Sequence, residues 1–199
     1  DNGQTHVRVT NQIFPCAIHI PMSREMVITQ WHVPIDDENC YWYSMFTSFK
    51  NPVDKELMRA QRLKEHRLPD YAPLRNKSNN YGYDPEEQAV KTFTGMGLDI
   101  NVHDQWAVES PGPIFNRRNE HLGKTDVGII KYRRMLRDAI ENLAAGNAAA
   151  LPMSSGSDVR SILGPVSIDA IGPWDAWRET LEISDTARRQ ACIDWDAKV

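Results

Sequence analysis

The chain has 199 residues, of which 41% are hydrophobic and 25% charged, with a formal net charge of −4. This length and balance are typical of one soluble globular domain, or a large part of one, with a sizeable core. The net negative charge gives no indication of a nucleic-acid or membrane-surface partner, and no apolar run approaches the roughly 20 residues of a membrane span.

Three cysteines are spread widely along the chain, at Cys16, Cys40 and Cys192. Their odd number and the absence of any Cys-x-x-Cys spacing argue against a disulfide framework. We therefore expect reduced, small hydrophobic side chains at these positions and a cytoplasmic location for the protein.

The N-terminal part of the chain predicts antiparallel β-structure. Apolar and polar residues alternate, with many β-branched and aromatic side chains, over residues 6–10, 26–33 and 40–49, and residues 13–20 are an apolar run. Turn residues separate these runs, which favours a meander. We interpret the acidic segment Asp-Asp-Glu-Asn at 36–39 as a solvated hairpin turn rather than a metal site.

The next part of the chain predicts a helix and then a long loop. Residues 54–67 have apolar residues at helical spacing, with Asp54 as a possible N-cap. Residues 69–84 are polar and contain SNNYGYDP, which is typical of a turn-rich loop. A loop of this length is usually functional or lies over a site.

The clearest predicted helix covers residues 125–145, with Thr125 as its N-cap and Gly146 as its C-terminal stop. The tail predicts a loop at 156–165, a strand at 166–171 and a short helix at 174–181. This order of elements predicts an α+β fold, in which a curved antiparallel sheet wraps on a long helix and leaves a pocket. The candidate pocket walls are Phe14, His19, Trp42, Met45 and Phe93.

Common catalytic and metal motifs are missing from the sequence. It has no HExxH, HxH, GxSxG or P-loop, and residues 93–97 hold two glycines without the third of a dinucleotide loop. One segment, residues 101–130, combines charged residues with a Pro-Gly turn. There Asp104 is either a helix N-cap or a functional carboxylate. Glu109, Arg117 and His121 each also allow a purely structural interpretation.

A family resemblance narrows these alternatives. The string HDQWAVESPGPIFNRRNEHLGKTDVGIIKYRRML, residues 103–136, resembles the C-terminal catalytic region of Rieske non-haem iron oxygenase α subunits, in the phthalate-dioxygenase-like branch. The segment WHVPIDDENCYWYS, residues 31–44, and the preceding VRVTNQIFPCAIHIP resemble the same branch. The matched motif residues are Asp104, Glu109, Ser110, Gly112, Pro113, Ile114, Arg117, Glu120, His121, Leu122, Gly123, Thr125 and Asp126.

The resemblance implies a helix-grip, START-like fold and a defined chemistry. In this family, two histidines and one carboxylate hold a mononuclear Fe(II), which uses O₂ to hydroxylate or O-demethylate an aromatic substrate. The electrons come from NAD(P)H through a separate reductase, with or without a ferredoxin, and then through a Rieske [2Fe–2S] cluster. The family's members are homo-oligomers.

Asp104 falls at the position of the family's carboxylate iron ligand, five residues before the matched Glu109. The resemblance implies structural or neighbouring roles for His103, Glu109, Arg117 and His121. His103 stands where glutamine is frequent in the family, and the residue before Arg117 is Asn where aspartate is usual. Neither departure removes the expected ligand.

Two features of the family are not found in the sequence. The Rieske ligand pattern, C-x-H followed by C-x-x-H, does not occur, and neither does the helical pair of iron-binding histidines. Together with a first residue other than Met, this leads us to expect that residues 1–199 are the C-terminal part of a catalytic domain. We expect the Rieske domain and the histidine helix to be absent from the chain, and the chain alone to be inactive.

Two other classes of function stay open at this point. One is a non-catalytic helix-grip module that binds a small molecule, in which Asp104 is only a cap. The other is a hydrolase or isomerase that uses Asp104, Glu109 or His103 as acid–base groups. The residues alone do not identify a substrate.

Overall fold

The structure is a computed structural model that describes residues 3–22, 25–147, 164 and 166–196, with side chains up to Gln190. The chain divides into two units, Asp1–Pro52 with His121–Val199, and Val53–Glu120. Each unit is described by itself below. Within the described ranges, no helix has both the length and the apolar character needed to cross a bilayer.

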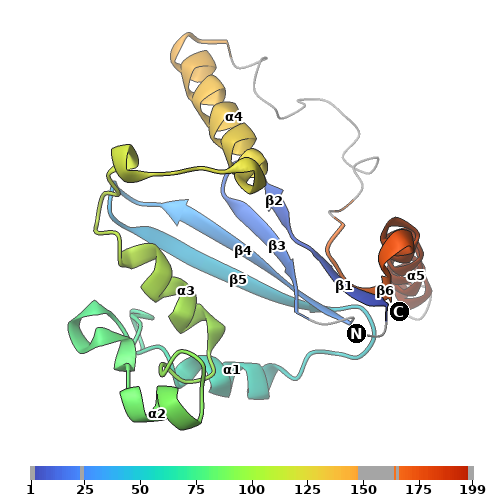
Figure 1. Ribbon diagram of the computed structural model, residues 1–199, viewed down its shortest axis with the longest axis horizontal. Coiled ribbons are helices and arrows are strands. Elements are labelled where there is room, and N and C mark those ends of the chain that lie inside the picture. The colour runs from blue at the N-terminus through green and yellow to red at the C-terminus, as the bar shows by residue number, and fades with distance from the viewer. Residues whose placement is uncertain (1–2, 23–24, 148–163, 165, 197–199) are drawn as a thin grey trace. The chain divides into compact units, whose positions relative to one another are not determined.

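Four strands of the first unit form the predicted antiparallel meander (Figure 1). Neighbours in the chain are neighbours in the sheet, and in the last pair of strands Thr29 lies opposite Met45. The strands are β2 (Asn11–Ile13), β3 (Ala17–Pro21), β4 (Met26–Pro34) and β5 (Cys40–Ser48).

The predicted strand at 13–20 is two strands in the structure. The chain turns at residues 14–16, between β2 and β3, where Pro15 lacks the N–H that a ladder position requires. The hairpin between β4 and β5 agrees with the prediction. There Asp36 Oδ1 accepts hydrogen bonds from the backbone N–H groups of Glu38 and Asn39, at 2.8 and 2.7 Å. These bonds, from Glu38 first, lower the pKa of Asp36, so this carboxylate stabilises the turn.

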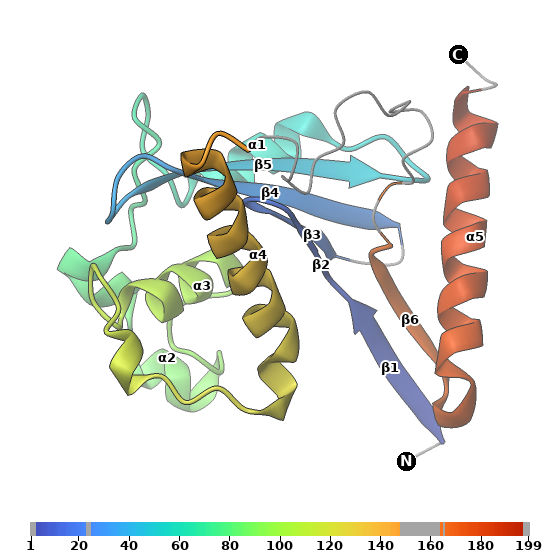
Figure 2. The ribbon, with the colours of Figure 1, turned by 90° about the horizontal axis from the view of Figure 1, so that it is seen from above.

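A separate two-stranded sheet joins distant parts of the chain. Strand β1 (Gln4–Val9) pairs antiparallel with β6 (Ile168–Pro173), so the predicted strand at 166–171 starts and ends two residues later. Helix α5 (Trp177–Asp196) follows a short 3₁₀ turn and runs beside β6 (Figure 2). The predicted helix at 174–181 was therefore too short. The predicted loop at 156–165 lies outside the described residues except for Gly164.

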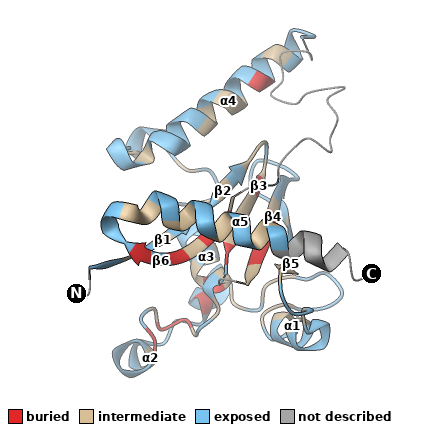
Figure 3. Ribbon diagram, turned by 90° about the vertical axis from the view of Figure 1, so that its right-hand side faces the viewer, coloured by how far each residue is buried: buried red, intermediate tan, exposed pale blue. Residues whose placement is uncertain are grey.

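The buried core of the first unit is formed mainly by apolar residues of β3, β4 and β6 (Figure 3). Both faces of the first half of β4 are buried, including Val27 and Ile28, whereas its end is exposed. On β6, Ile168 and Ala170 are buried and Ile171 is exposed, which is the alternation of a half-covered strand.

Helix α4 (Val127–Ala144) confirms the long predicted helix, with two differences. Its N-cap is Asp126 rather than Thr125, because residues 124–126 form a 3₁₀ turn that Asp126 closes by accepting from the Gly123 N–H at 2.7 Å. Gly146 ends the helix with a φ of 74°, as predicted. Its apolar positions Ile129 and Ile140 are exposed, so the wrapping of the sheet on this helix stays a prediction.

The second unit is helical and has a small core of Tyr81, Met96 and Val102. Asp54 caps its first helix as predicted, accepting from the Leu57 N–H at 2.9 Å. Its elements are α1 (Lys55–Leu63), the 3₁₀ segment η1 (Lys77–Gly82), α2 (Pro85–Val90), α3 (Ile100–Glu109) and η2 (Arg117–Asn119). The chain is therefore α+β with antiparallel sheets, as expected.

Candidate functional site

Helix α3, which carries Asp104, begins at Ile100, so Asp104 is not at its N-terminus. Asp99 is the N-cap of α3, and its side chain accepts a hydrogen bond from the Asn101 N–H at 2.9 Å. Asp104 therefore lies in the middle of the helix. The interpretation of Asp104 as a helix cap is wrong, and its carboxylate is not needed to satisfy the start of the helix.

Asp104 lies on the outward face of α3. Val102, which is buried in the core of the unit, is separated from Asp104 by about 200° around the helix axis. One turn to either side of Asp104, Ile100 and Val108 are 62% and 73% exposed, and Asp104 itself is exposed. The second unit thus presents a carboxylate between two apolar side chains on a helical face that its own core does not use.

His103 connects the inner side of α3 to the preceding loop. Its Nε2 lies 2.9 Å from Thr94 Oγ1 and 3.1 Å from the Gly97 carbonyl oxygen. A carbonyl oxygen only accepts, so Nε2 carries its hydrogen and has no lone pair for a metal. In this arrangement, the role of His103 is to hold the helix to residues 94–97.

Glu109 lies at the other end of α3 and accepts a hydrogen bond at 2.6 Å from the hydroxyl of Tyr81. Tyr81 is only 4% exposed. Burial first, and then this bond to Glu109, raises the pKa of Tyr81 to about 12, so its hydroxyl stays a donor at neutral pH. Glu109 is exposed, and this hydrogen bond connects the end of the helix to the buried Tyr81.

The residues that follow α3 form a short structured turn. The side chain of Asn116 caps η2, accepting from the Arg118 N–H at 3.1 Å. Arg117 pairs with Glu120 at 3.0 Å and lies over the Phe115 ring, 5.4 Å from its centroid. His121 is exposed and belongs to the first unit. Of the predicted site residues, the structure places His103, Asp104 and Glu109 on one helix.

The residues fit one position of the expected iron site. An exposed carboxylate such as Asp104 is a suitable hard oxygen ligand for Fe(II). The Nε2 atom of His103 is not suitable in this arrangement, because it donates to the Gly97 carbonyl oxygen. Over the part of the chain that the structure describes, no three His, Cys, Asp or Glu residues gather in a metal-binding arrangement. Among the described residues, Asp104 therefore offers one carboxylate of the type that such a two-histidine, one-carboxylate set requires.

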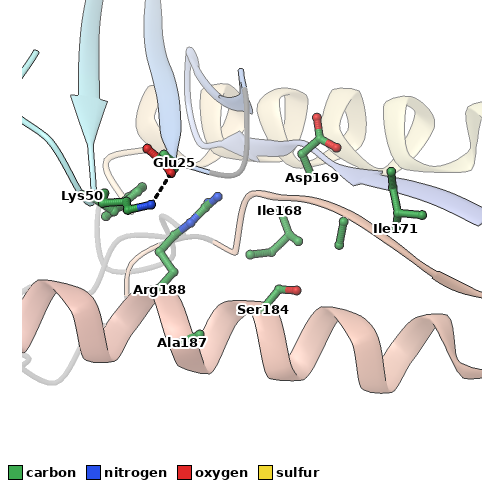
Figure 4. Close-up of a pocket in the computed structure, with 10 residues that line it drawn as sticks. Glu25, Lys50, Ile168, Asp169, Ile171, Ser184, Ala187 and Arg188 are labelled. Carbon is green, nitrogen blue, oxygen red and sulfur yellow. Dashed lines mark hydrogen bonds and ion pairs between the residues drawn. The ribbon is translucent and has the colours of Figure 1, made fainter.

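A pocket of about 540 Å³ lies in the first unit, between β6 and α5 (Figure 4). Arg188 points into it from α5, beside the ion pair of Lys50 with Glu25 at 2.9 Å. With Asp169 at the other side, the two positive and two negative side chains balance, so the lining gives no preference for a charged ligand. None of the predicted site residues lines this pocket.

The second unit contains a smaller pocket of about 380 Å³. Its wall includes the rings of Tyr83, Phe93 and Trp106 over the side chain of Met96. Among the candidate pocket walls from the sequence, Phe93 lines this pocket, and it is 96% exposed.

Sequence reasoning missed three residues that hold α3: Arg62, Tyr81 and Asp99. Arg62 pairs with Asp99 across the unit at 2.5 Å. An Asp just before the apolar residues Ile100 and Val102 is a recognisable capping signal, which could have located the helix start. Nothing comparable marks Arg62 or Tyr81, because their partners are distant in the sequence.

Comparison with known proteins relates this chain to a family. Residues 1–190 match the family described as "LigXa C-terminal domain like". The chain belongs to this family. It is 30% identical over 151 residues to the phthalate 4,5-dioxygenase oxygenase subunit of Pseudomonas putida, covering 72% of this chain and 34% of that protein.

A second relative is the 3-chlorobenzoate-3,4-dioxygenase oxygenase subunit of Comamonas testosteroni. The chain is 26% identical to it over 158 residues, covering 70% of this chain and 36% of that protein. The chain thus spans about a third of the length of each of these relatives. The resemblance seen in the sequence is confirmed: the chain is a relative of Rieske oxygenase catalytic domains.

Proposed function

We propose that this chain is the C-terminal part of the catalytic domain of a Rieske-type aromatic-ring oxygenase, and that Asp104 is the carboxylate ligand of its mononuclear iron. The observation that carries the proposal is the place of Asp104 in α3. It is a mid-helix carboxylate on an exposed face, and Asp99 rather than Asp104 caps the helix.

The two histidine ligands, on this proposal, come from a part of the protein outside this chain, as does the Rieske [2Fe–2S] cluster. Bound Fe(II) would supply the activation of O₂ next to the aromatic ring, with electrons from NAD(P)H through a reductase, with or without a ferredoxin. Asp104 contributes a hard anionic oxygen to that ion. Ile100 and Val108, one turn to either side, would place apolar side chains beside the bound ion.

The substrate class follows from the relatives. Both proteins named above carry the name of an aromatic acid, phthalate or 3-chlorobenzoate, in their own activity. We therefore propose an aromatic acid as substrate, with ring hydroxylation or oxidative O-demethylation as the outcome. We also propose a helix-grip arrangement, a homo-oligomer and a cytoplasmic location for the full-length protein.

The geometry disfavours the two other classes of function. The non-catalytic binding module required Asp104 to be a cap, and it is not one. A hydrolase or isomerase requires titratable groups that converge on one substrate. Here the Glu109 carboxylate is hydrogen-bonded to Tyr81, and the His103 ring is hydrogen-bonded to Thr94 and Gly97, so the two groups have separate partners.

The test compares the full-length protein with its Asp104→Ala variant. The measurements are iron content, the absorbance of the [2Fe–2S] cluster, and NADH-dependent O₂ consumption with phthalate and chlorobenzoates. We expect the variant to keep its cluster and lose its mononuclear iron and O₂ consumption. Asp138→Ala, which removes another exposed mid-helix carboxylate, is the control and should behave as the wild type. Retention of iron and activity in Asp104→Ala would contradict the ligand assignment.

A further inference from the structure

Helix α3 is held at three points along its length, all within the second unit. At its start, Asp99 caps the helix and pairs with Arg62 at 2.5 Å. In its middle, His103 Nε2 lies 3.1 Å from the Gly97 carbonyl oxygen. At its end, Glu109 accepts from the Tyr81 hydroxyl at 2.6 Å. Because these contacts are distributed along the helix, they restrict both its tilt and its rotation.

The contact at the end of the helix depends on an unusual backbone. Asn80, Tyr81 and Gly82 follow one another with φ values of 51°, 55° and 67°. A run of left-handed residues is costly for side chains other than glycine and persists only where the surroundings determine it. Here Asn76 supplies part of those surroundings, since its carbonyl oxygen accepts from the Tyr81 N–H at 2.8 Å.

This backbone turns the Tyr81 side chain into the core with Met96 and Val102. A phenylalanine would fill that core equally well, so packing alone does not explain the hydroxyl. The hydroxyl donates a short hydrogen bond to Glu109, and bonds of this length to a carboxylate are among the stronger ones. Tyr81 thus adds to the core a directional contact with the helix that carries Asp104.

We propose that Tyr81 is a positioning residue for the iron site: through Glu109, it fixes the end of α3 and thereby the direction in which Asp104 presents its carboxylate. The inference rests on the proposed function, because it needs Asp104 to be a ligand. It goes beyond that function in assigning a role to a buried loop residue and to the left-handed turn that holds it. A metal ligand is effective only when neighbouring groups fix its orientation.

The experiment uses the full-length protein with Tyr81→Phe, and Tyr83→Phe as its matched control. The control removes a tyrosine hydroxyl two residues away, which donates to Gln88 Oε1 of α2 at 2.7 Å rather than to a residue of α3. The readouts are the Fe(II) dissociation constant of the mononuclear site, the electron paramagnetic resonance spectrum of its nitric oxide adduct, and hydrogen exchange over residues 100–109.

We expect Tyr81→Phe to weaken Fe(II) binding about tenfold, as for residues that orient metal ligands. It should also alter the nitric oxide spectrum and speed exchange at the end of α3, whereas Tyr83→Phe should match the wild type in all three. Wild-type iron affinity and an unchanged spectrum in Tyr81→Phe would overturn the proposal, whatever happens to hydrogen exchange.

A second pair of variants tests the same bond if Tyr81→Phe fails to fold. Glu109→Gln keeps an acceptor for the Tyr81 hydroxyl and should retain iron. Glu109→Ala removes that acceptor and should weaken Fe(II) binding about as much as Tyr81→Phe does. Equal, wild-type affinities in both Glu109 variants would overturn the proposal. Retention of iron in Asp104→Ala would instead reject the proposed function itself, so the two failures are distinguishable.

Discussion

One oxygen of Asp99 lies 2.5 Å from Arg62 Nη2, and its other oxygen caps the helix that carries Asp104. The side chains of Arg62 and Asp99 are 28% and 11% exposed, so the pair is mostly shielded from water. Two other nitrogens of Arg62, Nε and Nη1, are buried without a hydrogen-bond partner. Asp99 is therefore the principal partner of a largely buried cation.

Removing Asp99 should destabilise the protein through both of its contacts. We expect Asp99→Ala to lower the free energy of unfolding by about 2–4 kcal/mol, from the lost cap and the unpaired Arg62. Asp99→Asn keeps a good cap and should lose only the ion pair. Asp54→Ala removes the N-cap of α1 and should cost about 1 kcal/mol. Urea denaturation followed by circular dichroism measures all three, and equal losses for Asp99→Ala and Asp54→Ala would contradict the role of Arg62.

A methyl group at Gly95 should be poorly tolerated, for two separable reasons. Gly95 has a φ of 68°, and an added Cβ would lie 2.5 Å from the backbone oxygen of Asp84. Gly112 also has a positive φ, of 101°, but open space around its Cβ position. We expect Gly112→Ala to cost about 1–2 kcal/mol from backbone strain alone. Gly95→Ala should cost more, by about 1–3 kcal/mol for the clash. Similar thermal midpoints for the two variants would show that no clash occurs.

Tyr81 should ionise at a higher pH than an ordinary tyrosine. Its pKa of about 12 lies above its ordinary value of 10, so the folded state retains this proton longer than the unfolded state. The corresponding stability is fully present below pH 10 and is lost as the pH rises toward about 12. An alkaline titration followed by tyrosinate absorbance should show a late step that Tyr81→Phe removes. If the titration shows no step above pH 10 that depends on Tyr81, the burial and hydrogen bonding of Tyr81 are contradicted.

His19 should ionise below its ordinary pKa of 6.5. Partial burial is the first cause and the positive charge of Arg188 is the second. The folded state therefore binds this proton less readily than the unfolded state. The corresponding stability is present above pH 6.5 and is lost as the pH falls through the lower folded pKa.

A variant separates these two causes. Arg188→Met keeps most of the apolar stem, which lies beside the Phe49 ring, and removes the charge. We expect the pKa of His19, followed by nuclear magnetic resonance, to rise while staying below 6.5, because burial remains. An unchanged pKa would show that the charge of Arg188 does not reach His19.

Local patterns predicted those parts of the fold that local forces determine. The meander, the hairpin at Asp36 and the cap at Asp54 all depend on alternation or on contacts between near neighbours in the chain. The strand at 13–20 was predicted as continuous because its apolar run continues through Pro15, where the chain turns. An apolar run shows which side chains suit a sheet, whereas the missing N–H of a proline decides whether the ladder can continue.

The candidate site was predictable only in part, for a similar reason. Family resemblance located Asp104, but no sequence pattern showed that Tyr81, in a segment that reads as a polar loop, is buried against α3. Its conformation depends on the neighbouring Asn80 and on a carboxylate 28 residues later in the chain. Such a contact is a property of the assembled unit and leaves no periodic signal in the sequence.

The pairing of β1 with β6 has a consequence for the synthesis of this protein. His6 lies opposite Ile171, so the partner of β1 is made long after β1 itself. At about 5–20 residues per second, that delay is on the order of ten to thirty seconds. During this time β1 is without the strand that it pairs with in the structure, although the β2–β5 meander can already form from neighbouring segments. Strand β1 is thus made long before its partner in this chain, and its unpaired edge needs protection from other chains while the ribosome is still at work.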